Sequence, residues 1–441
     1  LALGVLTPII ALIWQATQAD LSHWDNLLTY VLPAALKNTV LLLAGVAVMV
    51  GVIGVGSAWA VTAWDFPGRK ILSWALLLPL AMPTYIVAFA WLDLLHPIGP
   101  LQTFIRFLLG FDSPRQFRLP DLRSLSGAII LLGLVLYPYV YLTTRAMFIS
   151  QPAHLLEAAR TLGCSATGTF FRVALPMARP ALAVGISLAL LETLNDIGAS
   201  EFLGVQTLTV TVYTTWISRS DLSAAAQIAC MMLMFIFLIL TLEFYGRRKQ
   251  GFSSRSLREI QPTRVQGWRG WLLGGVISLP VLLGFLAPVL FLMWESAKRI
   301  GDENPLSSSL LSALQNTLSL AAGTTLVVVC VSMLVAWSAR HSAADNAMPG
   351  FRRGVMRLAS LGYAVPGTIL AIGFLTPAMA VDRWLADLLD VRGLPLMSAG
   401  ILLVICCAMR FQAIAIGALD SGLGRIPPSL EDRKSTRLNS S

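Results

Sequence analysis

The chain has 441 residues, of which 56% are hydrophobic and 12% are charged, and its formal net charge is +9. Soluble domains contain about 25% charged residues, whereas a bilayer requires about 20 consecutive apolar residues for each span. The composition therefore excludes an ordinary soluble domain and favours a membrane protein. The positive charge needs no nucleic acid as a partner, because Lys and Arg collect on the cytoplasmic loops of membrane proteins.

Apolar windows in the sequence predict an all-α polytopic membrane protein with ten helices. We expect the first helix to be incomplete, because the sequence starts at Leu1 inside an apolar run, and we expect Pro83, Pro138 and Pro366 to kink their helices. The windows lie near residues 1–14, 38–62, 71–92, 126–148, 177–196, 224–245, 270–294, 316–338, 356–380 and 396–418.

Basic residues indicate which loops face the cytoplasm. The segment 246–269 holds seven Lys and Arg residues against one acid, so we expect it to be cytoplasmic. Alternation along the chain then places the loops near Arg69, Arg160 and Arg353 on the same side. The loops of mixed charge fall outside, including the long loop 93–125, which is more basic than this assignment favours. These features predict a multi-pass membrane protein.

The two halves of the sequence resemble each other. The run "KNTVLLLAGVAVMV" at 37–50 is similar to "QNTLSLAAGTTLVV" at 315–328, and the pairs Asn38-Thr39 and Asn316-Thr317 are each expected to open a helix. The run "LLPLAMPTYIVAFA" at 77–90 is similar to "SLGYAVPGTILAIG" at 360–373. We interpret this as a parallel duplication. The predicted parts are a first repeat (1–245), a cytoplasmic linker (246–269), an incomplete second repeat (270–432) and a tail (433–441).

A third similarity between the halves ends abruptly near the C-terminus. Pro152 corresponds to Pro427 and Glu157 to Asp432, but from Arg433 onward the small residues of the first copy have no counterpart. We therefore expect the tail "RKSTRLNSS" to be foreign to the natural protein, which would continue with two further spans. A chain that has only one of its two docking loops is not expected to transport.

One cytoplasmic stretch carries the most specific motif of the sequence. Residues 150–180 read SQPAHLLEAARTLGCSATGTFFRVALPMARP, in which the fixed positions are Glu157, Ala158, Ala159, Gly163, Val173, Leu175 and Pro176. This spacing resembles the coupling-loop signature of permeases of ATP-binding-cassette (ABC) importers, where isoleucine is usual at the Val173 position. The resemblance implies that these residues dock a cytoplasmic ATPase.

The residue types of this loop predict a short helix with a thin outer face. We expect Pro152 to open the helix, and we expect Ala158 and Ala159 to form a small-residue face that fits a groove on a partner. Gly163 is expected either to end the helix or to allow close packing of a second helix. The pair Leu175-Pro176 is expected to redirect the chain before the next span.

Further stretches narrow the resemblance to the ferric-iron type of ABC importer permease. They are "FPGRKILSWALLLPLAMPTYIVAF", "GAIILLGLVLYPYVYLTTRAMF" and "LLETLNDIGASEFLGVQTLTVTVYTTW". The resemblance implies two fused copies of the type I importer fold, a periplasmic solute-binding protein and two cytoplasmic ATPase subunits. The sequence contains no Walker A motif, so we expect a transport permease rather than an enzyme, with no bound cofactor and with ATP used by the partner.

Two acids and three tyrosines are candidates for a substrate path. Glu192 and Asp196 lie four residues apart on one helix face, and acids at membrane depth usually face the interior of a helix bundle. Fe³⁺ is a hard cation that suits carboxylate and phenolate oxygens, and Tyr137, Tyr139 and Tyr141 would supply phenolates. Alternatively, the acids are hydrogen-bonded structural groups and the tyrosines are ordinary residues of the membrane interface. The cysteines and histidines form no metal-site pattern.

Other functions stay open at this point. Thiamine, a phosphonate or another small solute is an alternative cargo to ferric iron, because fused permeases for these solutes are similar in sequence. A secondary transporter also has parallel halves, although the coupling-loop motif disfavours that class. A polytopic membrane enzyme is the third alternative, and no catalytic constellation supports it. Dependence of uptake on ATP separates an ABC importer from a secondary transporter.

Overall fold

The computed structural model describes residues 2–18, 27–247, 261–302, 308–344, 365–390, 397 and 400–423. By contacts between Cα atoms the chain forms two compact units. The larger unit holds residues 21–214 and 234–303, and the smaller unit holds residues 1–20, 215–233 and 304–441. The tail 433–441, most of the basic linker and the end of the predicted second repeat lie outside the described residues.

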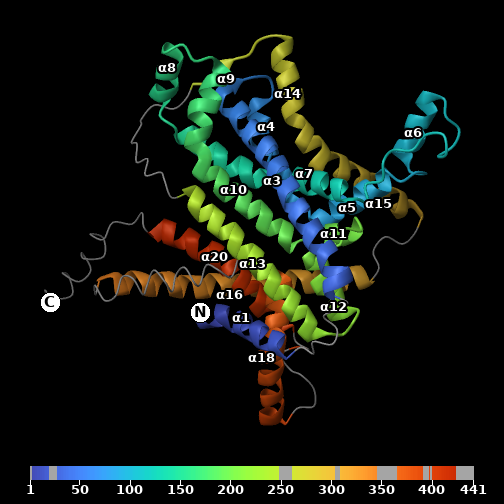
Figure 1. The fold of residues 1–441 in the computed structure, drawn as a ribbon, viewed down its shortest axis with the longest axis vertical. Helices are drawn as coiled ribbons and strands as arrows, with labels where there is room; N and C mark the ends of the chain where they lie inside the picture. Colours follow the sequence, from blue (N-terminus) through green and yellow to red (C-terminus); the bar gives the residue numbers. More distant parts are fainter. Residues whose placement is uncertain are drawn as a thin grey trace. The chain divides into compact units, whose positions relative to one another are not determined.

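Helices make up almost all of the described structure, as Figure 1 shows. The first half contains α1 (Ala2–Thr17), η2 (Leu27–Val31), α3 (Leu32–Ala63), β1 (Trp64–Asp65), α4 (Arg69–Ala75), η3 (Leu78–Ala81), α5 (Thr84–Leu94), α6 (Pro100–Leu109), α7 (Leu125–Ser150), α8 (Ala153–Thr161), α9 (Ala166–Thr169), η4 (Phe170–Ala174), α10 (Leu175–Asn195), α11 (Gly198–Phe202), α12 (Leu208–Ile217) and α13 (Leu222–Arg247). The second half contains β2 (Thr263–Arg264), α14 (Trp268–Val281), η5 (Leu282–Leu286), α15 (Ala287–Asp302), α16 (Ser308–Ala344), α18 (Gly367–Leu389) and α20 (Ile401–Leu423).

Eight of the described helical segments are long and apolar enough to cross a membrane. A further pair, Arg69–Ala81 and Thr84–Leu94, passes the same test together but is bent by 92°, and Leu6–Thr17 is a shorter apolar helix. Each predicted window corresponds to one of these segments. An all-helical chain satisfies its backbone hydrogen bonds internally, as the bilayer requires. The predicted all-α, multi-pass fold class is confirmed.

Of the three prolines expected to kink helices, Pro83 and Pro366 begin helices, whereas Pro138 lies within one. Pro83 breaks the predicted helix 71–92: its ψ of 136° is extended, and it caps the start of α5. Its repeat equivalent Pro366 caps the start of α18 in the same way, with ψ 144°. Both prolines therefore begin helices, because proline lacks an N–H but fits the position before the first turn. Pro138 lies inside α7, which continues as one span through it.

The prediction that Asn38-Thr39 and Asn316-Thr317 open helices is wrong. The helices α3 and α16 begin several residues earlier, at Leu32 and Ser308. The Thr39 hydroxyl donates to the Ala35 carbonyl at 2.7 Å and accepts from the Leu208 N–H at 2.9 Å. A threonine inside a helix bonds to the carbonyl four residues back, so its presence does not mark a helix start.

Glycines allow close approach of the helices in the larger unit. A Cβ atom on Gly54 of α3 would lie 2.9 Å from the backbone nitrogen of Tyr141 in α7. A Cβ atom on Gly185 of α10 would lie 2.7 Å from the Cα atom of Val140 in the same helix α7. Small residues at such crossings are typical of membrane helices, where packing replaces hydrophobic exclusion from water. The three helices α3, α7 and α10 therefore form the core of this unit.

The two compact units do not coincide with the two predicted repeats, because each unit contains segments from both repeats. The helices α14, η5 and α15, from the start of the predicted second repeat, lie in the larger unit against α4, α5 and α7. Trp91 of α5 donates its indole N–H to the Leu283 carbonyl at 3.1 Å. In the smaller unit, α1 packs on α18, where Gly373 lies against the backbone of Pro8. The repeat boundaries, which concern sequence similarity, stay a prediction.

Two glycines of one helical segment provide a test of this packing. A Cβ atom on Gly284 would lie 2.5 Å from the Leu134 carbonyl oxygen, whereas a Cβ atom on Gly275 meets nothing within 4 Å. We expect Gly284→Ala to lower the melting temperature in detergent by several degrees, because a backbone atom cannot yield to the added methyl group. Gly275→Ala should leave it unchanged or raise it slightly. Equal melting temperatures for the two variants would contradict the described contact between η5 and α7.

Candidate coupling loop and substrate-path residues

The helix α8 carries the first part of the motif and is amphipathic. Ala153, Leu156 and Ala159 are buried and recur every three residues, which places them on one face. The prediction that Ala158 and Ala159 share an outer face is wrong, since Ala158 is exposed and Ala159 is only 9% exposed. The outer surface of α8 is of mixed polarity and ends at Leu162, which is 85% exposed; its other exposed residues are His154, Leu155, Glu157, Ala158, Arg160 and Thr161.

Gly163 ends α8 through its backbone conformation. Its φ is +88°, in the left-handed region that glycine adopts without a steric penalty. The Gly163 N–H donates to the Arg160 carbonyl and the Cys164 N–H donates to the Ala159 carbonyl, both at 3.0 Å. These two bonds form a Schellman motif. The alternative of close helix packing is wrong, because a Cβ atom at this position would meet nothing within 4 Å.

The buried face of α8 rests on an aromatic cluster. Leu156 belongs to the same core as Trp59 of α3 and Phe148 of α7. The Trp59 ring lies 5.2 Å from the Phe148 ring and 5.2 Å from the Phe170 ring of η4, measured between centroids. Directly before α8, Gln151 is buried and donates its side-chain N–H to the Ala174 carbonyl at 2.9 Å. The loop is therefore fixed to all three core helices through buried contacts.

The second part of the motif lies in a continuous helix, so the prediction that Leu175-Pro176 redirects the chain is wrong. Residues Ala166–Asn195 form one span, in which α9 and the π-helical segment η4 lead directly into α10. Pro176 follows the π-helical segment, and a proline is accommodated where the regular hydrogen-bond ladder is already interrupted. Val173 and Leu175 pack against the core with partly buried side chains.

The end of the basic linker lies beside the coupling loop. Strand β2 pairs in parallel with β1 at the end of α3, with Trp64 opposite Thr263, and the Val265 N–H donates to the Asp65 carbonyl at 2.9 Å. A small cavity of about 80 Å³ is lined by Glu157 of α8, Trp59 and Thr263, among others. This agrees with the prediction that linker and coupling loop lie on the same side of the membrane.

Asp196 has a structural role in the described fold. It follows the last residue of α10, and one carboxylate oxygen accepts from the Ala199 N–H at 2.7 Å, in the first turn of α11. The other carboxylate oxygen accepts a hydrogen bond from the Thr84 hydroxyl at the start of α5. Glu192 lies one turn earlier and is partly buried. The carboxylate of Asp196 thus joins two helix starts, which supports the structural alternative for this residue.

The three tyrosines do not share one surface. Tyr137 and Tyr141 are fully buried on one face of α7, and the Tyr141 hydroxyl donates to the Ser73 carbonyl at 2.7 Å. Tyr139 is partly buried and lies between them in sequence, so its side chain leaves α7 on another side. Buried packing therefore accounts for two of the three. Among the residues that the structure describes, no group of three or more His, Cys, Asp or Glu side chains is arranged to hold a metal ion.

The role of Asp196 is tested by its removal. We expect Asp196→Ala to destabilise the protein by about 1–2 kcal/mol, because the Ala199 N–H and the Thr84 hydroxyl lose their acceptor. Asp196→Asn keeps one acceptor oxygen and should cost less. Thermal unfolding of the purified variants measures both effects. An Asp196→Ala variant with wild-type stability and reduced uptake would restore the path interpretation.

Sequence spacing did not reveal the aromatic cluster under α8, the Gln151 bond or the partner of Asp196. Trp59, Phe148 and Phe170 are far apart in the chain, and each occurs in an apolar run where an aromatic residue is unremarkable by composition. Only a hydrophobic position every three residues in "AHLLEAART" indicated that α8 has an inner face.

Comparison with known proteins agrees with this geometry. Residues 51–250, which contain α7, α8, α10 and the end of α3, match the family of binding-protein-dependent transport system inner membrane components. Over this segment the chain is similar to the membrane components of ABC importers. The description of that family as an inner membrane component agrees with the predicted multi-pass membrane location.

Individual relatives include permeases named for different solutes. A sulfate transport system permease protein CysT from Salmonella typhimurium is 29% identical over 258 residues, covering 56% of this chain and 90% of the relative. An Fe(3+)-transport system permease protein FbpB 2 from Haemophilus influenzae is 26% identical over 384 residues, covering 84% of this chain and 69% of the relative. A solved bacterial alginate ABC transporter, in complex with an alginate pentasaccharide-bound periplasmic protein, is similar with a TM-score of 0.45 and 16% identity, covering 56% of this chain and 89% of that chain. Because these relatives are named for different solutes, the comparisons do not identify one cargo.

Proposed function

We propose that this chain forms the membrane path of an ABC importer and that α8 is the element on which a cytoplasmic ATPase subunit acts. The observation that carries the proposal is the two-sided character of α8. Its outer face presents Ala158 and Leu162, while its inner face holds Leu156 in the core. A helix that is exposed on one side and fixed to three spans on the other is suited to passing movement inward.

The movement would follow the described contacts. Closure of the ATPase pair on ATP would displace α8, and the aromatic cluster around Trp59 and the bond from Gln151 to Ala174 would carry α3, α7 and α10 with it. Packed cores shift as rigid bodies because they are dense and resist local deformation. The two ATPase subunits would bind and hydrolyse ATP, and this chain would hold no cofactor of its own.

A periplasmic solute-binding protein would deliver the cargo at the opposite end of the spans. The family is defined by dependence on such a protein. In our assignment the binding protein meets the loops that lie across the membrane from α8, and the two fused repeats would adopt the type I importer fold. The binding protein then selects the cargo, and the permease contacts it during passage.

Ferric iron is the cargo that we propose first. The relative named for Fe(3+) transport is similar over 84% of this chain, and so across both predicted repeats, whereas the relative named for sulfate covers 56%. Sulfate is the second candidate, because its relative shows the higher identity of the two. The partly buried acids near α11 offer no metal cluster among the described residues, so selection of iron would rest on the binding protein.

Uptake into proteoliposomes tests the class and the cargo together. The permease is reconstituted with its ATPase subunits and the binding protein encoded beside it, and accumulation of radiolabelled iron and of radiolabelled sulfate is measured with and without internal ATP. We expect ATP-dependent accumulation of iron. Accumulation of sulfate alone would transfer the assignment to the second cargo, and accumulation driven by an ion gradient without ATP would identify a secondary transporter.

The orientation in the membrane is tested by chemical labelling. In a background with the five native cysteines replaced by alanine, Gln266→Cys reports on the end of the linker and Arg115→Cys reports on the loop between α6 and α7; both positions are exposed. We expect an impermeant maleimide added to intact spheroplasts to label only the Arg115→Cys variant. Labelling of Gln266→Cys without lysis would reverse the orientation.

A further inference from the structure

The short helix α6 lies at the end of the spans opposite α8. It occupies residues Pro100–Leu109, between α5 and α7, and α7 separates it from α8 by a full membrane span. Both ends are fixed: Pro100 stands in the first turn, and Gly110 adopts a left-handed φ of +72° while the Phe111 N–H donates to the Arg106 carbonyl at 2.9 Å. A ten-residue helix is too short to cross a bilayer.

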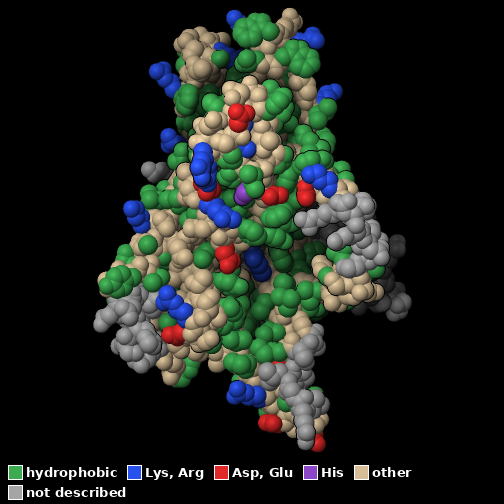
Figure 2. All heavy atoms as spheres, turned by 90° about the vertical axis from the view of Figure 1, so that its right-hand side faces the viewer, with side chains coloured by type: hydrophobic (Ala, Val, Ile, Leu, Met, Phe, Trp, Pro, Cys, Tyr) green, Lys and Arg blue, Asp and Glu red, His purple; other side chains and the backbone are tan. Residues whose placement is uncertain are grey.

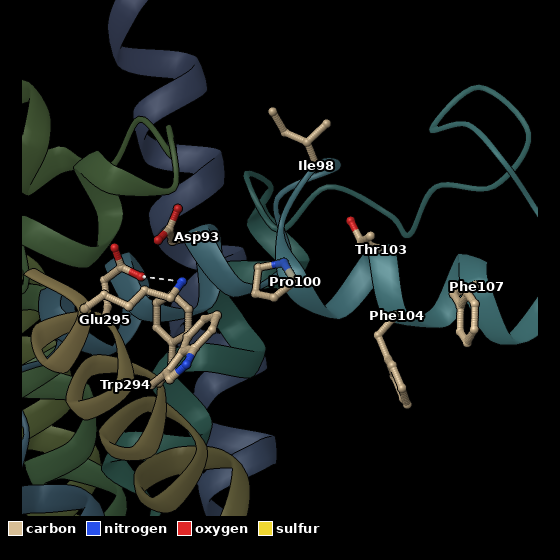
Figure 3. A pocket seen from close by; sticks show the side chains of 10 residues that line it. Asp93, Ile98, Pro100, Thr103, Phe104, Phe107, Trp294 and Glu295 are labelled. Atoms are coloured by element: carbon tan, nitrogen blue, oxygen red, sulfur yellow. Dashed lines mark ion pairs between the residues drawn. The ribbon is translucent and has the colours of Figure 1, made fainter.

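The two faces of α6 are reversed relative to a helix on a soluble protein. Its two long polar side chains are buried, with Gln102 1% exposed and Arg106 5% exposed, whereas the short Thr103 is exposed. Gln102 donates to the Leu95 carbonyl and accepts from the Leu119 N–H at 3.1 Å. The opposite face presents large apolar side chains, with Phe104 58% exposed and Phe107 80% exposed. Figure 3 shows the rings of Phe104 and Phe107 leaving α6 toward the same side.

An open cavity of about 610 Å³ continues this apolar face onto α15. Phe104 and Phe107 line it from α6, and Phe291 and Trp294 line it from α15, as seen in part in Figure 3. Charged groups stand at the same place: the Lys298 ammonium lies 3.4 Å from the centre of the Trp294 ring and 3.6 Å from the Glu295 carboxylate. Figure 2, which views the molecule from the side of α6, shows charged and apolar side chains mixed on this face.

Tryptophan beside lysine near the end of an apolar span is typical of the membrane–water interface. The α15 segment belongs to a helical segment apolar enough to cross a membrane, Trp268–Lys298, and its exposed Leu290 and Met293 are suited to contact with acyl chains. The apolar face of α6 joins this lipid-facing surface through the shared cavity. Exposed aromatic side chains in water would be unfavourable, whereas an amphipathic helix buries them between headgroups and acyl chains.

We propose that α6 lies in the interface of the leaflet opposite the coupling helix, with Phe104, Phe107 and Leu108 in lipid. The helix then anchors the loop 93–125 to the membrane surface. The hydrogen bonds of Gln102 to the loop backbone keep the polar face of α6 inward and its apolar face outward. This arrangement suits a helix that is surrounded by lipid on its outer side.

Site-directed spin labelling of the full chain in nanodiscs of phosphatidylethanolamine and phosphatidylglycerol tests this placement. A nitroxide is attached at Phe107→Cys in the cysteine-free background, with Arg115→Cys as the matched position in the polar part of the same loop. We expect the ratio of collision rates with oxygen and with a water-soluble nickel complex to be at least threefold higher at residue 107 than at residue 115. Oxygen partitions into lipid and the nickel complex stays in water, so this ratio reports depth.

Equal ratios at the two positions would overturn the proposal and place α6 in water. A low ratio at residue 107 that is accompanied by immobilisation of the label when loaded binding protein is added would also overturn it, because the apolar face would then be a protein-docking surface. Phe104→Cys provides a second variant, and both substituted side chains are exposed, so folding does not depend on them. The readout is independent of transport, so its result does not depend on the proposed function.

Discussion

Replacement of Gly163 by valine is expected to abolish most of the coupling between ATP hydrolysis and transport. The Gly163 backbone has a φ of +88°, which costs about 1–2 kcal/mol for residues with a Cβ atom and more for a branched one. Valine would unwind the end of α8 and displace Leu162. We expect at least a tenfold loss of ATPase stimulation by loaded binding protein in proteoliposomes, with the permease still present in the membrane.

Asparagine at the same position is the matched control. It tolerates the left-handed conformation better than any other residue with a side chain, and the added atoms meet open space. Gly163→Asn should therefore keep most of the stimulation, although it is larger and more polar than glycine. If the valine and asparagine variants lose activity equally, the backbone explanation is wrong and the site tolerates no side chain for another reason, such as contact with the ATPase.

Replacement of Leu162 by glutamate is expected to weaken binding of the ATPase subunit at least tenfold. Leu162 is the C-cap residue of α8 and is 85% exposed, the largest exposure among the apolar side chains of this loop. Burying a leucine stabilises a complex by about 1.5–3 kcal/mol, and a carboxylate in its place would also have to be desolvated. Titration of labelled ATPase subunit onto the permease in nanodiscs measures the affinity.

Gln116→Glu introduces the same charge in the loop on the opposite side of the membrane and should leave the affinity unchanged. Its side-chain carbonyl oxygen accepts hydrogen bonds from the backbone of Asp112 and Ser113, and glutamate preserves that acceptor. Normal affinity of the Leu162→Glu variant would remove Leu162 from the docking surface. A variant that fails to reach the membrane would instead assign Leu162 a role in folding, which its exposure argues against.

The sequence determined the class of fold because the bilayer leaves few choices. Apolar runs of the required length form helices whose backbone groups are satisfied internally, so the windows around α3, α7 and α13 predicted spans without knowledge of their neighbours. The spacing from Glu157 to Pro176 resembles a coupling-loop signature, and part of its structure could be predicted for a similar reason. Its short helix and its glycine stop are local features that depend on residues close together in the chain.

Only the tertiary structure decided which face of each helix is used. Ala158 and Ala159 are neighbours of equal size, and the packing of α8 against α9 and η4 leaves Ala158 exposed and turns Ala159 inward. Asp196 was a candidate for a metal path until Thr84 and the start of α11 supplied its partners. Apolar side chains are equally favourable against lipid and against another helix, so hydropathy cannot distinguish the two surfaces. That choice follows from shape, from glycines such as Gly54 and Gly185 that allow contact, and from polar groups that find partners far away in the chain.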